Sequence, residues 1–542
     1  MHNELTGISR HSALSNSLPL AGSSSLARVR GRLGVGATRG TSPHVTPPSQ
    51  PFPASGGRSY RAVLRTSLAL AATLFVSACA VGPDFVKPAT VAPERFAQAD
   101  TNVATPSAAV DTAFWHGFND PLLSQLVDDA LDANHDLRMA LARYDRANAL
   151  LRGAKFDYLP TITAQGEATD SRASADQLPG VPRDARDSES YSAAAVASWE
   201  LDVFGRVRRG VESSRAEAAA DAADLAALQV SIVGDVARSY LELRGLQERL
   251  RVARENAENQ QETLRLVQAR YDAGRGTEFD TSRARAQLEG TLANVPALEA
   301  EVAVMMHRIA VLTGKTPDAL IAQLQTPAPL PALPAAVDAG TPGDLLRRRP
   351  DVAAAEQRLH AATARIGVAT ADLFPRFTLG GLIGSQAIDS SALFERDSET
   401  RLVALGIDWS FLDIGRVRAR IAAADADAEG ELARYQQTVL RALEDVENAL
   451  VRHDRTRSED AHRERAATDS ANAARLARVR YEAGAADLFE VLDAERTRLQ
   501  AQDAFAEART RSATSVVALY KALAGGWPDR VPVREKIAKY TD

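Results

Sequence analysis

The chain has 542 residues, more than one ordinary core requires, so we expect several domains or a repeated architecture. Apolar residues make up 45% of the chain but aromatic residues only 5%, a composition that favours long helices over a thick globular core. Residues 1–78 carry eight basic side chains and one acidic one, so the remainder has 56 basic against 69 acidic residues and a net charge of −13, which argues against a nucleic-acid partner.

The N-terminal region combines a leader with an export signal. Residues 1–57 are rich in Ser, Pro, Gly and Ala, so we expect a disordered leader that is either untranslated or removed with the signal. Residues 58–78 place arginines before a short apolar run and small residues before Cys79, as in a secretory signal too short to span a bilayer. Cys79 is the single cysteine, so disulfides and thiolate metal sites within the chain are excluded.

Two interpretations of Cys79 remain open. The segment resembles a bacterial lipobox, which implies cleavage before Cys79 and acylation of its sulfur. The sorting rule for bacterial lipoproteins depends on the residue after the cysteine, and Ala80 in place of Asp at this position disfavours retention in the inner membrane. The alternative is a chance cysteine after an apolar stretch.

A repeat of 210 residues divides the rest of the chain. The sequence Arg-Tyr-x-Ala-Gly occurs at 270–274 and at 480–484, and Trp199 and Trp409 have the same offset. Upstream matches have an offset of 215, so the length difference lies in the loop between 169 and 191, and we predict an ancient duplication. The predicted parts are an N-terminal anchor segment (79–118), a first repeat (119–326), a Pro- and Ala-rich linker (327–341), a second repeat (342–526) and a C-terminal tail (527–542).

Four segments alternate between apolar and polar residues, which predicts strands near 159–169, 191–202, 375–385 and 401–412. Each is about as long as the 9–11 residues that a tilted strand needs to cross a bilayer. A membrane β-barrel fits this alternation, and a soluble hairpin on a helical body fits it equally. The candidate interface aromatics of a membrane barrel are Tyr191, Trp199, Trp409 and Phe411.

Four strands cannot close a barrel, and an open sheet edge is not tolerated in lipid. The membrane interpretation therefore requires several copies of the chain. Two copies would give a narrow, filled barrel, whereas the twelve strands of three copies would leave a lumen.

Long helices are the other predicted element. No proline occurs within 206–274 or 416–484, and about 65 helical residues at ~1.5 Å each give a rod of about 100 Å. Return helices are expected over 279–312, with a kink at Pro296, and over 488–523. Rods of this length joined to barrel strands indicate a tube that crosses the periplasm.

The chain resembles the TolC-like outer-membrane factors, specifically the lipoprotein branch called the nodulation-T family, over about residues 61–526. The matching motifs are the lipobox at Cys79, Phe114-Trp115, Asp120-Pro121-Leu122, Asp-Leu-Leu-Arg-Arg-Arg-Pro-Asp-Val at 344–352, Ala355-Glu356, Ile366-Gly367, Phe374-Pro375 and both Arg-Tyr-x-Ala-Gly tips. The resemblance implies a mainly α fold with β: a long α-helical periplasmic barrel and four transmembrane strands per protomer, which build a twelve-stranded barrel in a homotrimer. It also implies a lipid-anchored outer-membrane duct that works with a periplasmic adaptor and usually an inner-membrane pump of the resistance–nodulation–division type.

The same resemblance implies a gate at the periplasmic end. Its acidic residues are Glu490 and Asp493, and Asp280 is the corresponding acid after the first tip. Six converging carboxylates would repel one another, raise some of their pKa values and favour cations in the pore. Alternatively, Glu490 and Asp493 merely stabilise a helix N-terminus, by roughly 0.3–1 kcal/mol. Ala485 and Ala486 replace polar locking residues of some relatives, so other contacts are expected to hold the closed state.

Adaptor docking is implied at the two tips, whose residues are Tyr271, Ala273, Gly274, Arg275, Tyr481, Ala483, Gly484 and Ala485; a plain hairpin turn fits the same residues. No His-Glu-x-x-His pattern or phosphate-binding loop is present, so we expect no enzyme and no cofactor or metal besides the lipid on Cys79. Drug or metabolite efflux is the favoured function. A type I secretion channel and a poreless periplasmic coiled-coil lipoprotein remain as alternatives.

Overall fold

The computed structural model describes residues 80–89, 92–97, 113–334, 339–525 and 530–534. Every described residue belongs to one unit, Ala69–Asp542. The predicted leader, the predicted signal and Cys79 lie outside the described residues.

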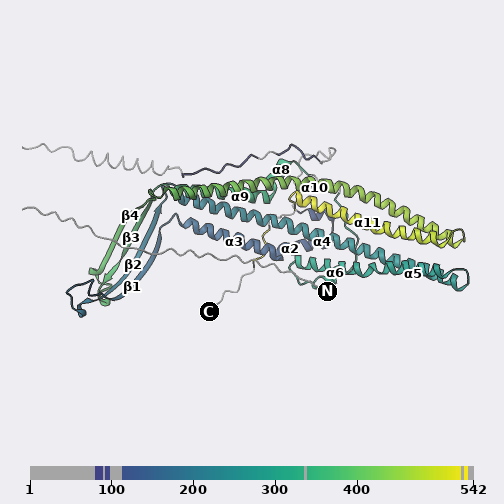
Figure 1. Cartoon of the computed structure of the whole chain (residues 1–542), viewed down its shortest axis with the longest axis horizontal. Helices are drawn as coiled ribbons and strands as arrows, with labels where there is room; N and C mark the ends of the chain where they lie inside the picture. The colour runs from purple at the N-terminus through teal and green to yellow at the C-terminus, as the bar shows by residue number, and fades with distance from the viewer. Residues whose placement is uncertain (1–79, 90–91, 98–112, 335–338, 526–529, 535–542) are drawn as a thin grey trace, which may run out of the picture. The chain divides into compact units, whose positions relative to one another are not determined.

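The two halves of this unit share one order of main elements: a short and a longer helix, two strands, one long helix and a return path of one or two helices (Figure 1). The first half comprises η1 (Phe114–Phe118), α2 (Pro121–Ala133), α3 (His135–Phe156), β1 (Thr161–Arg172), η2 (Arg183–Arg186), β2 (Asp187–Leu201), α4 (Arg206–Asp272), α5 (Glu278–Leu292), α6 (Asn294–Leu312) and α7 (Ile321–Leu324). The second half comprises α8 (Pro342–Arg348), α9 (Pro350–Ala371), β3 (Arg376–Ala387), η3 (Ser390–Ala392), η4 (Arg396–Ser398), β4 (Glu399–Asp408), α10 (Ile414–Glu482) and α11 (Leu488–Ala522). The predicted mainly helical, duplicated fold with four strands is confirmed.

The strands form one antiparallel sheet in the order β1-β2-β3-β4. The connection between β1 and β2 spans 173–186 and that between β3 and β4 spans 388–398, so the second connection is shorter, as the change of offset predicts. The last strand ends at Asp408 and not near 412, because Asp408 pairs with Arg376, the first residue of β3. Pro375, directly before Arg376, has no N–H with which to extend the ladder.

The long helices α4 and α10 contain 67 and 69 residues, which corresponds to about 100 Å each. The return path of the first half is divided at Ala293 into α5 and α6, whereas α11 is continuous over 35 residues. Pro296 causes the break, because it cannot donate to the carbonyl of Leu292, the last residue of α5. Within the described part of the chain, no helix combines the length and the apolar character needed to cross a membrane.

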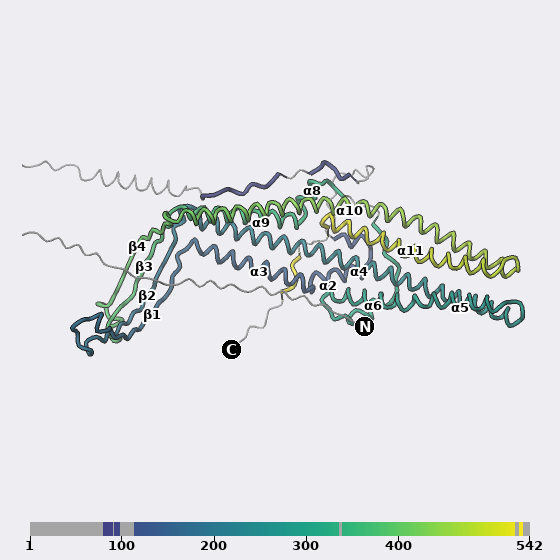
Figure 2. The backbone as a smooth tube through the Cα atoms, viewed as in Figure 1, coloured from purple at the N-terminus to yellow at the C-terminus, as the bar shows by residue number. Residues whose placement is uncertain are grey.

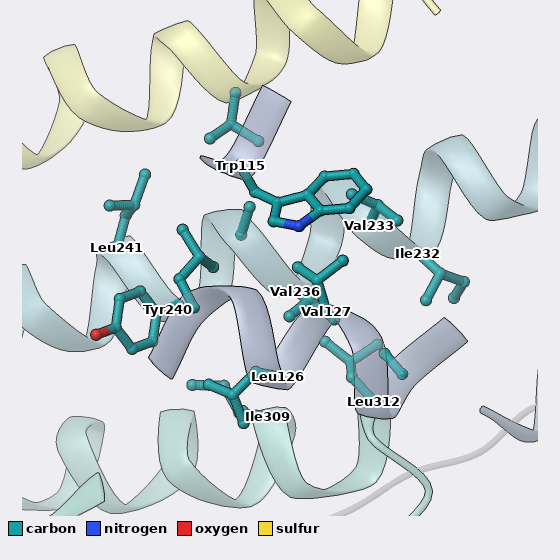
Figure 3. Close-up of a cluster of buried hydrophobic side chains, with 14 of the residues drawn as sticks. Trp115, Leu126, Val127, Ile232, Val233, Val236, Tyr240, Leu241, Ile309 and Leu312 are labelled. Carbon is teal, nitrogen blue, oxygen red and sulfur yellow. The ribbon is translucent and has the colours of Figure 1, made fainter. Parts of the chain in front are cut away.

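The main core lies where α2, α6 and α11 pack against the middle of α4 (Figure 3). Its α4 side chains include Ile232, Val233, Val236 and Leu241, all nearly inaccessible to solvent. Tyr240 of the same helix donates to Asp120 Oδ2 at 2.5 Å, and burial together with this hydrogen bond raises the pKa of the tyrosine to about 12. This core fixes the centre of α4, from which the sheet and the hairpin tips extend in opposite directions (Figure 2).

Candidate functional site

The sheet has one apolar and one mostly polar or small-residue face. Register pairs Phe377 with Ile407 and Leu379 with Leu405, and the same face continues through Trp199 on β2. The side chains of Ile162, Ile383, Val403, Leu405 and Ile407 are between 62% and 81% exposed in the single chain. The opposite face carries mainly Thr, Ser, Gln, Glu, Gly and Ala, together with Val196 and two leucines. The predicted alternation is therefore present on all four strands, and its apolar face has no cover within the described chain.

Two tryptophans mark the junction between strands and helices. Trp199 Nε1 donates to the carbonyl oxygen of Tyr158 at 3.1 Å, and Trp409 Nε1 donates to that of Leu373 at 3.0 Å. These bonds are equivalent in the two repeats, because the acceptors precede β1 and β3 by the same distance in sequence. A polar ring atom anchored beside an apolar sheet is the arrangement that suits tryptophan at a membrane–water boundary. Phe411 packs against Trp409 with ring centroids 5.5 Å apart, whereas Tyr191 lies at the other end of β2.

The residues that follow Cys79 bind at this junction. The amide of Val81 donates to the carbonyl oxygen of Phe204 at 3.1 Å, and Ala80 lies against Gly205. Arg209 secures the segment through an ion pair with Asp84 at 2.6 Å. Cys79 is the next residue toward the N-terminus, so the chain leaves the described part at the base of the sheet.

The predicted tips are the turns between α4 and α5 and between α10 and α11. Gly274 and Gly484 have φ values of 69° and 74°, the left-handed conformation that ends a helix with little strain in glycine. The tyrosines of the two motifs differ: Tyr271 is 42% exposed, whereas Tyr481 is buried. Arg270 lies over the Tyr481 ring, 3.9 Å from its centroid, and therefore connects the first hairpin to the second.

The three predicted gate acids have different local partners. Asp280 caps α5 with Thr277, which donates to Asp280 Oδ2 at 2.7 Å. Glu490 lies in the first turn of α11 and is ion-paired with Arg480 of α10. Asp493 lies beyond that turn and is paired with Arg496 at 2.5 Å. The helix-terminus interpretation thus fits Asp280 and the position of Glu490, but it does not account for Asp493.

One buried charged residue near the tips was not predicted from the sequence. Glu495 of α11 is 2% exposed and accepts from Arg478 of α10 at 2.6 Å and from Thr263 of α4 at 3.3 Å. Helical spacing could have indicated its burial, because Glu495 lies on the same packed face of α11 as Leu488 and Leu492. No group of three or more potential metal ligands occurs among the described residues.

Comparisons with known proteins agree with this architecture. The family model described as outer membrane efflux protein matches residues 126–315 and 341–525. The chain is 32% identical to nodulation protein T of Rhizobium leguminosarum bv. trifolii over 467 residues, which cover 84% of this chain and 96% of that protein. It is 34% identical to the pyoverdine export outer membrane protein OpmQ of Pseudomonas putida over 79% of this chain and 91% of that protein.

Among solved structures, the outer-membrane channel OprN matches with a TM-score of 0.78 and 42% identity, over 83% of this chain and all of that one. The two segments matched by the family model together cover most of the described residues and include both repeats. The chain belongs to the outer membrane efflux protein family and is a TolC-like efflux channel of the outer membrane.

Proposed function

We propose that the chain is the lipid-anchored, homotrimeric exit duct of a tripartite pump, which passes drugs and other small organic molecules without changing them chemically. The observation that carries this proposal is the sheet: among the described residues, strands β1 and β4 each have a neighbouring strand on one side only. An unpaired edge beside an apolar, lipid-compatible face requires another copy of the chain.

Strand direction supports closure by identical copies. In the order β1-β2-β3-β4 every neighbouring pair is antiparallel, so β1 and β4 also run in opposite directions. The β4 edge of one copy can therefore continue the antiparallel ladder with the β1 edge of the next. Three copies supply twelve strands, enough to enclose a lumen.

The helices that adjoin the two edge strands, α3 and α10, each carry exposed apolar side chains at the same spacing. On α3, which leads into β1, Met139 and Leu150 are 52% and 56% exposed. On α10, which follows β4, Leu440 and Val451 are 61% and 38% exposed and have the same spacing along their helix. Contact between these helices in neighbouring copies would extend the strand interface into the helical tube.

Further parts of the proposal concern the anchor, the gate and the partners. Binding of Ala80 and Val81 at the base of the sheet supports acylation of Cys79, because a lipid there would lie at the membrane surface.

The tips present their turns at the end opposite the sheet, where a periplasmic adaptor and an inner-membrane pump of the resistance–nodulation–division type would dock (Figure 1). Glu490 and Asp493 are proposed as the gate, with Asp280 as a helix cap beside it.

The proposal of small-molecule cargo rests on relatives named for the compounds that they export, such as the pyoverdine export protein OpmQ. A type I secretion channel would instead carry a polypeptide. Deletion of the gene should raise sensitivity to small toxic molecules without loss of a secreted protein. Loss of a secreted protein alone would favour type I secretion.

Photo-crosslinking tests the assembly. A photoreactive residue in place of Gln165 on β1 should give covalent dimers and trimers whose crosslinked peptides come from β4 of another copy. The same residue in place of Val196, on β2 between two bonded neighbours, is the matched control and should give few. Crosslinks confined to one chain would contradict the trimer, and an intact mass without added lipid on Cys79 would contradict the anchor.

A further inference from the structure

Each carboxylate of the proposed gate has an arginine partner in its own subunit. Glu490 is ion-paired with Arg480, which comes from the last turn of α10. Asp493 is ion-paired with Arg496, one turn further along α11, at 2.5 Å. The gate therefore consists of two acid–base pairs per subunit and not of two unpaired acids.

Arg480 is held in place across the tip turn. Besides Glu490, its guanidinium donates to the carbonyl oxygen of Ala485 at 3.4 Å. Arg480, Glu490 and Asp493 line one groove between α10 and α11, whose apolar wall includes Phe489. The turn that lacks polar locking side chains at Ala485 and Ala486 is thus bridged by a cation from the preceding helix.

The first repeat supplies a further cation at this place. At the repeat offset of 210, Arg283 of α5 corresponds to Asp493, so an acid in one hairpin is a base in the other. The Arg283 guanidinium carbon lies 4.9 Å from the centroid of the Phe489 ring and 5.6 Å from that of Phe279. Glu490 directly follows Phe489, so Arg283 adds positive charge beside the gate.

We infer that Arg480 and Arg496 neutralise the gate acids, so that charge selectivity at the periplasmic entrance is set by these arginines and anionic or zwitterionic small molecules are not repelled there. The inference rests on the proposed gate. A carboxylate paired at hydrogen-bond distance presents a dipole to the pore, and the field of a dipole falls off faster than that of a single charge. At physiological ionic strength, charges further away than about 8 Å are largely screened, so the nearest side chains decide what an ion in the gate experiences.

The experiment compares single channels of the mature protein in planar bilayers with a KCl gradient. The double variant Arg480→Gln/Arg496→Gln exposes the acids and should shift the reversal potential towards potassium, with a severalfold higher cation-to-anion permeability ratio than that of the wild type. Glu490→Gln/Asp493→Asn should shift it towards chloride and raise the conductance of the closed channel. The matched control is Arg254→Gln/Arg265→Gln, which removes two exposed, ion-paired arginines of α4 outside the gate and should leave the reversal potential unchanged.

Oligomer mass and the helical circular dichroism signal verify that each variant is folded. An unchanged reversal potential in Arg480→Gln/Arg496→Gln, while Glu490→Gln/Asp493→Asn still raises conductance, would overturn the neutralisation and leave the gate intact. If Glu490→Gln/Asp493→Asn changes neither conductance nor reversal potential, the gate itself is wrong. An equal shift in the Arg254→Gln/Arg265→Gln control would show a general loss of positive charge and also overturn the inference.

Discussion

Glu495 and Arg478 form an ion pair across α11 and α10 in which the carboxylate is 2% exposed and the guanidinium side chain 35% exposed. Thr263 of α4 donates to the same carboxylate, so one buried charge joins both hairpins. Removal of the arginine leaves a buried negative charge without its partner, whereas removal of the acid leaves an arginine that still reaches water.

The pair therefore predicts unequal effects of its two single substitutions. Arg478→Met should destabilise the folded chain by about 2–4 kcal/mol, and Glu495→Met by clearly less. The double substitution should recover much of the loss, because apolar side chains of similar volume then fill the site. Thermal unfolding followed by circular dichroism measures all three, and equal losses in the two single variants would contradict the asymmetry.

Close packing of α4 against α11 at Gly245 makes a second prediction. A Cβ atom at this glycine would lie 2.0 Å from Thr510 Oγ1, so Gly245→Ala must separate the helices and should cost about 1–3 kcal/mol. Gly210 on the same helix has open space around its Cβ position. Gly210→Ala should stabilise the chain by about 0.5–1 kcal/mol, and a loss of stability there would contradict this account of α4.

The paired tryptophans at the base of the sheet make a third prediction. Trp199→Phe and Trp409→Phe each delete one hydrogen bond to a main-chain carbonyl and should each cost about 1 kcal/mol. Thermal dissociation of the detergent-solubilised oligomer measures the effect. Because the two hydrogen bonds are equivalent in the two repeats, both variants should dissociate at a lower temperature than the wild type. A decrease in only one variant would contradict this equivalence.

His453 of α10 predicts acid sensitivity. Burial lowers the pKa of this histidine below its ordinary value of 6.5, and Arg457 lowers it further. Protonation is therefore easier in the unfolded chain, so stability is unaffected above about pH 6.5 and decreases as the pH falls from there towards the folded pKa. The slope cannot exceed about 1.4 kcal/mol per pH unit for one group.

The matched variant is His453→Gln, which removes the titrating ring beside Ser515. Its melting temperature should decrease less between pH 7 and pH 5 than that of the wild type. Equal decreases would exclude His453 as a source of the acid sensitivity.

Sequence patterns were sufficient to predict the helices and strands that depend on contacts between residues close together in the sequence. The strands follow from alternating residues, the long helices α4 and α10 from segments without proline, and the break between α5 and α6 from Pro296, and each of these signals is local in sequence. The end of β4 did not, because its last paired residue depends on where β3 begins. The pairing of Glu490 with Arg480 and of Glu495 with Arg478 also depends on how two helices are aligned, which spacing within either helix does not reveal.

The measurement that tests the central claim most directly combines native mass spectrometry of the purified mature protein with conductance recordings in planar bilayers. The account predicts a mass of three subunits, with one lipid-modified N-terminus per chain, and discrete channel openings from the same preparation. A folded single subunit that inserts no conducting pore would contradict it, because the open sheet edges and the apolar sheet face would then serve some purpose other than a shared barrel.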